Sequence, residues 1–496
     1  MRRALILIAV MTLARVAYLI WWSPYELVAD EAQYWDWSRR LSASYYSKGP
    51  GVAWAIALST RLFGVAEWSV RLPAAIASAV VAAAAARLAI DFAPPAHAAR
   101  AGLAAALLVN LVPAYQLCFI LMTIDAPYLA CWAAAASIAW RAYCAEREGR
   151  PSVAAWVACG AAIGVGFLFK YSMVLLIPGL AAFAWRERHR LSSGVGTRAM
   201  LALAAVAAVS SPVFWWNAQH HGAGVAHLLG FIASSGGDRP VRPALQYDPR
   251  WTIAFVAGQL AVIGPVLGVV AAAVRRDRRR DGVRFAIACA APMLLAFFFA
   301  TFKTKVEANW PTAAYITLLA IAAGAIAEST ATRRAQTLIA GYGAVALIGV
   351  HAPFAAAALP GVGRYVPVAR FHGAAAAVER LSTPIERFMN GHGHGSLIVV
   401  PMHNVAGLLA FYLPGHPIVA SAGRFFGNRP SAYDFFDDTN LAGPQTIGRP
   451  ALLVGATERQ WSERFVLKDV VAVWPYPPVF AAAELLGPRS GAPLDP

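Results

Sequence analysis

Long apolar runs recur along residues 4–353 of this 496-residue chain. Each run has roughly 17–25 residues, which is enough for a helix to cross a ~30 Å hydrocarbon core. Hydrophobic residues make up 59% of the chain and charged residues 14%, whereas soluble domains are about 45–50% apolar. The pattern therefore predicts a polytopic α-helical membrane protein.

We predict eleven membrane-spanning helices from these runs. They cover residues 4–22, 68–86, 101–117, 124–140, 153–169, 170–185, 199–216, 251–274, 285–302, 311–327 and 336–353. The first run is preceded by basic residues, but it has no small-x-small cleavage site and Arg15 interrupts it. We therefore interpret it as an uncleaved first span rather than a signal peptide.

Arginine clusters orient the predicted spans. They occur at Arg2–Arg3, Arg87 and Arg100, Arg141–Arg150, Arg186–Arg190, Arg275–Arg284 and Arg333–Arg334. All of them fall on one side if the chain alternates across the membrane, and basic loops are typically cytoplasmic. The sequence thus predicts a multi-pass protein of the bacterial inner membrane, with a cytoplasmic N-terminus and a periplasmic C-terminus.

The charge and the cysteines exclude other classes of protein. The net charge is +16, but the basic residues lie in short clusters between apolar runs, so we expect no nucleic-acid partner. The five cysteines all fall within or at the ends of apolar runs, so we expect no disulfide bond and no metal site built from them. We predict no cofactor, and whether the protein depends on a divalent metal is left open.

The composition changes after about residue 370. Short apolar stretches predict strands at 396–401, 417–421, 451–456 and 469–476, and residues 403–415 predict a short helix that ends at Pro414-Gly415. We predict two domains: residues 1–355 span the membrane and include a first outer loop at 23–67, and residues 370–496 form a small α/β domain outside it.

The unusual polar residues of this chain all fall on the predicted outer side. They are Asp30, Glu31, Arg39, Tyr45, Tyr46, Lys48, Asp125, Lys170, Lys303, Lys305, Glu307 and Asn309. Ionisable groups at membrane depth are costly and usually functional. Carboxylates and lysines brought together from separate segments predict a site that binds an anionic substrate and moves a proton.

These residues lie in motifs that resemble a known family. "DEAQYW", "YYSKGP", "DAPYL", "FKYSMVLLIPG" and "KVEANWPTAAY" occur in this order along the chain. The set is similar to the bacterial branch of glycosyltransferase family 39, which is related to protein O-mannosyltransferases and to the aminoarabinose transferase of lipid A. The resemblance implies the GT-C fold and a membrane glycosyltransferase that uses a polyprenyl-phosphate sugar.

The resemblance also implies roles for individual residues. Asp30 matches the catalytic acidic position, with Glu31 beside it and Tyr34 on the same helical turn; Lys48 matches a lysine near the carrier phosphate, and Asp125 a second acidic position. Two positions depart from the family pattern. Gly49 replaces a proline of the usual Lys-Pro-Pro, and Ser47 stands where the aminoarabinose enzymes have an acid, which argues against their sugar.

The chemistry of sugar transfer from a lipid phosphate suggests roles for further residues. The departing lipid phosphate needs cations, and Lys48, Arg39, Lys170, Lys303 and Lys305 are candidates. A hydroxyl acceptor needs a base, for which Asp30 is the candidate.

We expect a hexosyl or pentosyl group to pass from an undecaprenyl-type carrier to lipid A, another envelope glycan or a protein, at the outer face of the inner membrane. A transporter or flippase of lipid-linked sugars and a non-enzymatic scaffold are the alternatives.

Overall fold

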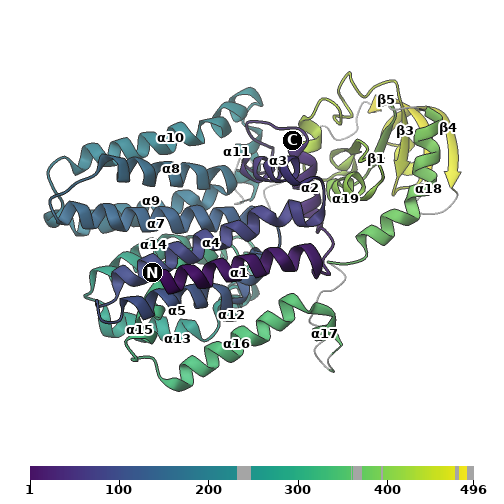
Figure 1. The fold of residues 1–496 in the computed structure, drawn as a ribbon. Coiled ribbons are helices and arrows are strands. Elements are labelled where there is room, and N and C mark those ends of the chain that lie inside the picture. The colour runs from purple at the N-terminus through teal and green to yellow at the C-terminus, as the bar shows by residue number, and fades with distance from the viewer. Residues whose placement is uncertain (232–246, 359, 361–370, 393–394, 475–479, 489–496) are drawn as a thin grey trace.

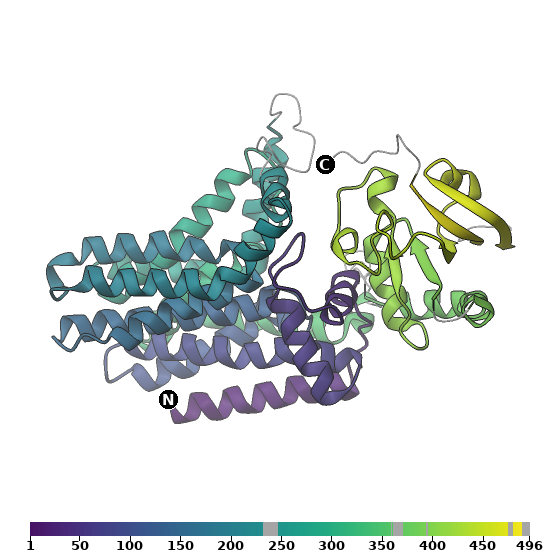
Figure 2. The same ribbon diagram turned by 90° about the horizontal axis from the view of Figure 1, so that it is seen from above.

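The computed structural model describes residues 1–231, 247–358, 360, 371–392, 395–474 and 480–488. An elongated bundle of helices is followed by a smaller domain that contains a sheet, and this domain covers one end of the bundle (Figures 1 and 2). The bundle contains α1 (Arg2–Trp21), α2 (Ala29–Ser38), α3 (Gly51–Phe63), α4 (Glu67–Phe92), α5 (Ala98–Leu111), α6 (Pro113–Cys118), α7 (Asp125–Arg147), α8 (Val153–Phe169), α9 (Leu176–Arg186), α10 (Val195–Gln219), α11 (Ala223–Phe231), α12 (Pro249–Ile263), α13 (Val266–Asp277), α14 (Asp281–Ala300), α15 (Tyr315–Ala327), α16 (Arg333–His351) and α17 (Pro353–Ala357).

Each predicted span is largely helical in the structure, but the helices differ in length. Among the described residues, α1, α4, α10 and α14 are long and apolar enough to cross a membrane alone. The helices α5 and α8, and the segments Tyr171–Arg186 and Thr312–Ala327, are apolar but shorter. The membrane-embedded character is thus supported, and the number of eleven spans stays a prediction.

One predicted span has the wrong shape. Residues 251–274 were expected to form a single helix, but α12 and α13 meet at an angle of 92°. Gly264 has a φ of +64°, outside the helical region, and Pro265 has no N–H to donate to a preceding carbonyl. The sequence Gly264-Pro265 therefore breaks the helix, and the segment is not one continuous span.

The arginine clusters gather at one end of the bundle. Arg147 and Arg190 contact the Asp281 carboxylate at 2.8 and 3.0 Å, and Arg284 contacts Glu187 at 3.2 Å. These pairs join the ends of α7, α9 and α14. The N-terminus of α1 lies at the same end, opposite the sheet (Figures 1 and 2). The structure therefore places these arginine clusters at one end of the bundle, as the predicted orientation in the membrane requires.

The segment after residue 371 folds around a five-stranded sheet of order β2-β1-β3-β5-β4. Its elements are α18 (Ala374–His392), β1 (Leu397–Val400), α19 (His403–Tyr412), β2 (Val419–Ser421), β3 (Arg449–Val454), α20 (Glu458–Ser462), β4 (Phe465–Trp474) and β5 (Phe480–Pro488). β1 runs parallel to β2 and β3, with Ile398 opposite Val419 and Leu452, whereas β5 is antiparallel to β3 and β4.

The strands predicted at 396–401, 417–421 and 451–456 and the helix at 403–415 are observed with shifted ends. The strand predicted at 469–476 is observed as far as Trp474, and its last two residues lie outside the described part of the chain. No strand was predicted at the position of β5.

Candidate active site

A cavity of about 180 Å³ lies where the first outer loop meets the sheet domain. One side is formed by α2 and the loop after it, and the other by the start of α19 and the segment that follows β2. The lining residues are Asp30, Gln33, Tyr34, Ser47, Lys48, His403, Arg429, Ser431 and Ala432. The cavity therefore combines residues about 400 positions apart in the sequence.

Helix α2 places its two adjacent acids in different surroundings. Glu31 is fully buried, and its carboxylate accepts hydrogen bonds from the Arg71 guanidinium at 2.8 and 2.7 Å. It also accepts from the backbone N–H groups of Met122 at 2.7 Å and Val28 at 3.1 Å. Glu31 thus ties α2 to α4 and to the segment before α7, and its side chain does not line the cavity.

Asp30 lines the cavity and is accessible to solvent. Within the described residues its carboxylate has no hydrogen bond or ion pair. Partial burial by the surrounding protein raises its pKa above the ordinary 3.8, although the positive charge of Lys48 opposes this shift. Tyr34, one turn further along α2, lines the same cavity. Asp30 is therefore a carboxylate with unused acceptor capacity and increased basicity.

Lys48 faces the cavity from a turn whose backbone is fixed. Its carbonyl accepts hydrogen bonds from the Tyr45 N–H at 3.0 Å and the Ser44 hydroxyl at 3.2 Å. Gly49 packs so closely on α8 that a Cβ there would lie 2.2 Å from the carbonyl oxygen of Leu168. The glycine that departs from the family pattern thus allows the turn to contact the backbone of α8.

Lys48 has no hydrogen-bond or ion-pair partner for its ammonium group in the described part of the chain. Burial lowers its pKa to about 8, and the charge of Lys170 acts in the same direction, while Asp30 opposes it. An anion placed in the cavity would compensate the buried charge. The unpaired ammonium group of Lys48 is therefore positioned to bind a phosphate or a carboxylate in the cavity.

Three of the predicted site residues form a polar cluster outside the cavity lining. They are Asp125, Lys170 and Asn309, which come from three separate segments of the chain. The Lys170 ammonium contacts Asp125 Oδ1 at 2.7 Å, and the Asn309 amide donates to Asp125 Oδ2 at 3.3 Å. None of the three lines the cavity. The charge of Asp125 acts on Asp30, and the charges of Asp125 and Lys170 act on Lys48, so this ion pair contributes to the electrostatic surroundings of the site.

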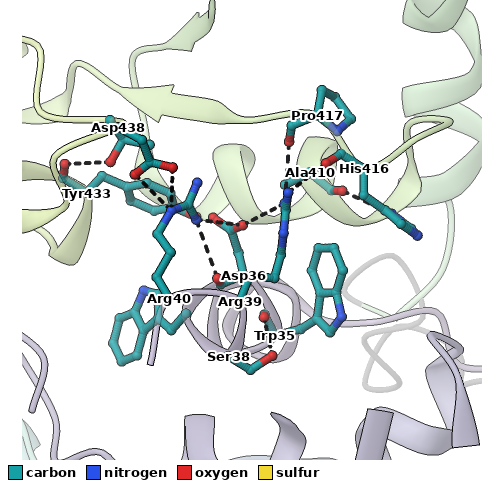
Figure 3. Close-up of polar contacts among 12 residues, drawn as sticks. Trp35, Asp36, Ser38, Arg39, Arg40, Ala410, His416, Pro417, Tyr433 and Asp438 are labelled. Atoms are coloured by element: carbon teal, nitrogen blue, oxygen red, sulfur yellow. Dashed lines mark hydrogen bonds and ion pairs between the residues drawn. The ribbon is translucent and has the colours of Figure 1, made fainter. Parts of the chain in front are cut away.

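Arg39 does not reach the cavity but holds α2 to the sheet domain (Figure 3). It contacts Asp36 Oδ1 at 3.0 Å and donates to the His416 carbonyl at 2.8 Å. Its neighbour Arg40 binds Asp438 Oδ2 at 2.7 Å and Asp36 Oδ1 at 3.0 Å. These contacts fix the two walls of the cavity relative to each other.

The remaining predicted residues lie away from the cavity lining. The Tyr45 ring stacks on Trp37 at 4.7 Å, and its hydroxyl donates to the Trp37 carbonyl at 3.1 Å. Tyr46 stacks on Phe435 of the sheet domain at 5.3 Å. Both tyrosines therefore pack within the protein. Lys303 and Lys305 are exposed, and Lys305 pairs with the exposed Glu307 at 2.9 Å.

Arg429 and His403 line the cavity but were not anticipated from the sequence. Burial lowers the pKa of His403 to about 4, and the nearby charge of Arg429 adds to the effect, so His403 is neutral near pH 7. Both residues lie in the C-terminal domain, with no acidic or glycine-rich motif to mark them. Only the packing of α19 on α2 brings them to Asp30. Within the described residues, no three His, Cys, Asp or Glu side chains are grouped as a metal site.

Comparison with known proteins relates the chain to membrane glycosyltransferases. Residues 47–216 match the family model described as dolichyl-phosphate-mannose-protein mannosyltransferase. The lipid A galacturonosyltransferase RgtD of Rhizobium johnstonii is 30% identical over 328 residues, which are 64% of this chain and 65% of that protein. The match thus spans slightly less than two thirds of that relative.

Solved structures share the fold at low identity. ArnT of Cupriavidus metallidurans bound to undecaprenyl phosphate gives a TM-score of 0.61 at 18% identity, over 96% of this chain and 97% of ArnT. The apo oligosaccharyltransferase of Archaeoglobus fulgidus gives 0.51 at 14% identity, over 88% of this chain and 67% of that one. The predicted resemblance and its GT-C fold are confirmed by these matches.

Proposed function

We propose that this chain, which shares the GT-C fold of ArnT, is a membrane glycosyltransferase. On this proposal it moves a sugar from a polyprenyl-phosphate carrier of the undecaprenyl type to an acceptor hydroxyl. The observation that carries the proposal is the cavity in which Asp30 and Lys48 face the same space without protein partners among the described residues. A base and a cation are the two groups that this transfer requires.

The proposed reaction is a single displacement at the anomeric carbon of the sugar. The acceptor oxygen bonds to C1 while the bond from C1 to the phosphate oxygen breaks, and the electron pair of that bond stays on the phosphate. The acceptor proton passes to the Asp30 carboxylate, whose raised pKa favours proton uptake. Lys48 stabilises the departing phosphate, which is anionic before and after transfer.

The relatives support a lipid acceptor. RgtD is named as a lipid A galacturonosyltransferase, so the acceptor of that relative is a lipid, while ArnT was solved with the carrier lipid undecaprenyl phosphate. We therefore propose lipid A as the acceptor, with another envelope glycan or a protein as the alternatives. The proposed location is the outer face of the bacterial inner membrane, because the arginine clusters lie at the end of the bundle opposite the cavity.

Incubation of the purified protein in detergent with radiolabelled undecaprenyl-phosphate sugar and lipid A tests the proposal. We expect label to move to lipid A with release of undecaprenyl phosphate, because a micelle has no second compartment and transport alone yields no product. Asp30→Asn should reduce the amount of product by orders of magnitude, and Asp437→Asn, at an exposed acid of the sheet domain, should not. Donor that binds but is never cleaved with any envelope acceptor would favour the transporter alternative.

A further inference from the structure

Arg429 is a second cation of the cavity, contributed by the C-terminal domain. It lies between two short 3-10 helices, Gly423–Phe426 and Ala432–Phe435. Within the described residues its guanidinium has no hydrogen bond or ion pair. In contrast, Arg39 and Arg40 of the adjacent interface are each held by carboxylate and carbonyl oxygens. The N–H groups of the Arg429 guanidinium are therefore available to donate hydrogen bonds to a ligand.

The loop that carries Arg429 is anchored on both sides. Before it, the Asn428 N–H donates to the Gly423 carbonyl at 2.9 Å. After it, the N–H and hydroxyl of Ser431 donate to Asp434 Oδ2 at 2.7 and 3.1 Å. Because the backbone is fixed independently of the Arg429 side chain, the arginine is not needed to hold its own loop. Its position is consistent with recognition of a ligand rather than with folding.

The two cations of the cavity lie on different domains. Lys48 is on the turn that packs against α8 of the helical bundle, whereas Arg429 is on the sheet domain at the end of that bundle. A polyprenyl carrier keeps its tail in the bilayer, so its phosphate reaches the cavity from the side of the bundle and meets Lys48. The sugar follows the phosphate and extends toward the sheet domain, where Arg429 lies.

We propose that Arg429 binds a carboxylate on the donor sugar, so that the transferred group is a hexuronosyl residue. This inference rests on the proposed function and names its substrate class. A guanidinium matches a carboxylate with two parallel hydrogen bonds, which a neutral hydroxymethyl group cannot form. A cationic amino sugar is disfavoured by the same arginine, because the two positive charges repel each other.

Binding to two donors that differ only at C6 tests this assignment. Undecaprenyl-phosphate galacturonate and undecaprenyl-phosphate galactose are titrated into the detergent-purified full chain by calorimetry, without acceptor. We expect the parent to prefer the uronate by about 10- to 100-fold, because a charged hydrogen-bonded pair is lost with galactose. Arg429→Gln should abolish the preference by weakening uronate binding alone, and Arg429→Lys should restore part of it.

The matched control is Arg459→Gln, at an arginine of the same domain whose side chain is 88% exposed; it should keep the full preference. Equal weakening of both donors by Arg429→Gln would assign Arg429 to the phosphate and overturn the inference. Unchanged donor binding with a raised KM for lipid A would assign it to an anion of the acceptor, which also overturns it. Transfer to lipid A, measured separately, decides the proposed function: a parent that prefers the uronate but transfers neither sugar retains Arg429 as the carboxylate-binding residue and overturns the proposed reaction.

Discussion

Asp30 and Glu31 are consecutive residues of α2, but their carboxylates face opposite environments. Glu31 is fully buried against Arg71, with a 2.7 Å contact between Oε2 and Nη2. Asp30 opens into the cavity and has no ion pair within the described residues. Successive residues of a helix point about 100° apart, so one acid can hold the fold while the other remains available for chemistry.

Asp30→Asn should reduce transfer by about 10²–10⁴-fold, because the amide cannot accept the acceptor's proton. Folding should be unimpaired. Because burial raises the pKa of Asp30, folding disfavours the ionised carboxylate relative to the unfolded chain, and the neutral amide should leave the melting temperature unchanged or raise it. Activity and thermal unfolding in detergent measure the two effects.

The acidic limb of the parent's pH profile should lie above pH 3.8, because Asp30 must be ionised to act as a base and its pKa is raised. Near-parental turnover in folded Asp30→Asn protein would reduce this residue to a structural role.

Lys48→Ala should weaken donor binding and turnover together, and Lys48→Arg should restore part of both, because the charge returns with a different geometry. Burial lowers the pKa of Lys48 to about 8, so its charge is present below that pH and is lost as the pH rises through it. Donor affinity measured by calorimetry should therefore fall on the alkaline side, to a smaller extent in Lys48→Arg. Parental affinity in Lys48→Ala would place the phosphate elsewhere.

Removing one partner of the buried pair Glu31–Arg71 should be strongly destabilising. Glu31→Gln leaves the Arg71 charge uncompensated, which costs about 3–5 kcal/mol for a buried pair. The double variant with Arg71→Met should recover part of this loss in thermal unfolding. The exposed pair Arg87–Asp91 is the control, and Arg87→Met should cost at most about 1 kcal/mol. Equal effects at both pairs would contradict the assigned role of Glu31.

Gly407→Ala should disrupt the cavity from a distance. Helix α19 packs so closely on α2 that a Cβ at Gly407 would lie 2.6 Å from the backbone nitrogen of Gln33. The sheet domain must then shift, carrying His403 and Arg429 away from Asp30. We expect a large loss of transfer with faster proteolysis between the domains, whereas Gly391→Ala, where an added Cβ would meet no other segment within 4 Å, should behave like the parent.

An exported reporter fused after Gln445 should be active, and a cytoplasmic reporter at the same position should be silent. The reason is the gathering of arginine clusters at the end of the bundle that carries the N-terminus. A fusion after Arg279 is the internal control and should give the reverse result. Cytoplasmic activity at Gln445 would place the cavity on the wrong face for the proposed reaction.

The sequence by itself determined the membrane-embedded helical character, most helix positions, four of the five strands and the resemblance to GT-C enzymes. These features are local: apolar runs, arginine clusters and short motifs can be read within a few tens of residues. The break at Gly264-Pro265 was missed because a long apolar run is compatible with one span or with two bent pieces.

Only the tertiary structure decided how the polar residues are divided between fold and cavity. It paired Glu31 with Arg71, Asp125 with Lys170 and Arg39 with Asp36, stacked Tyr45 on Trp37, and left Asp30 and Lys48 facing the cavity. It also brought in Arg429, about 400 residues from Asp30. Sequence reveals which side chains carry charge, but whether a charge is neutralised depends on long-range packing, because its partner can come from any segment that the fold places beside it.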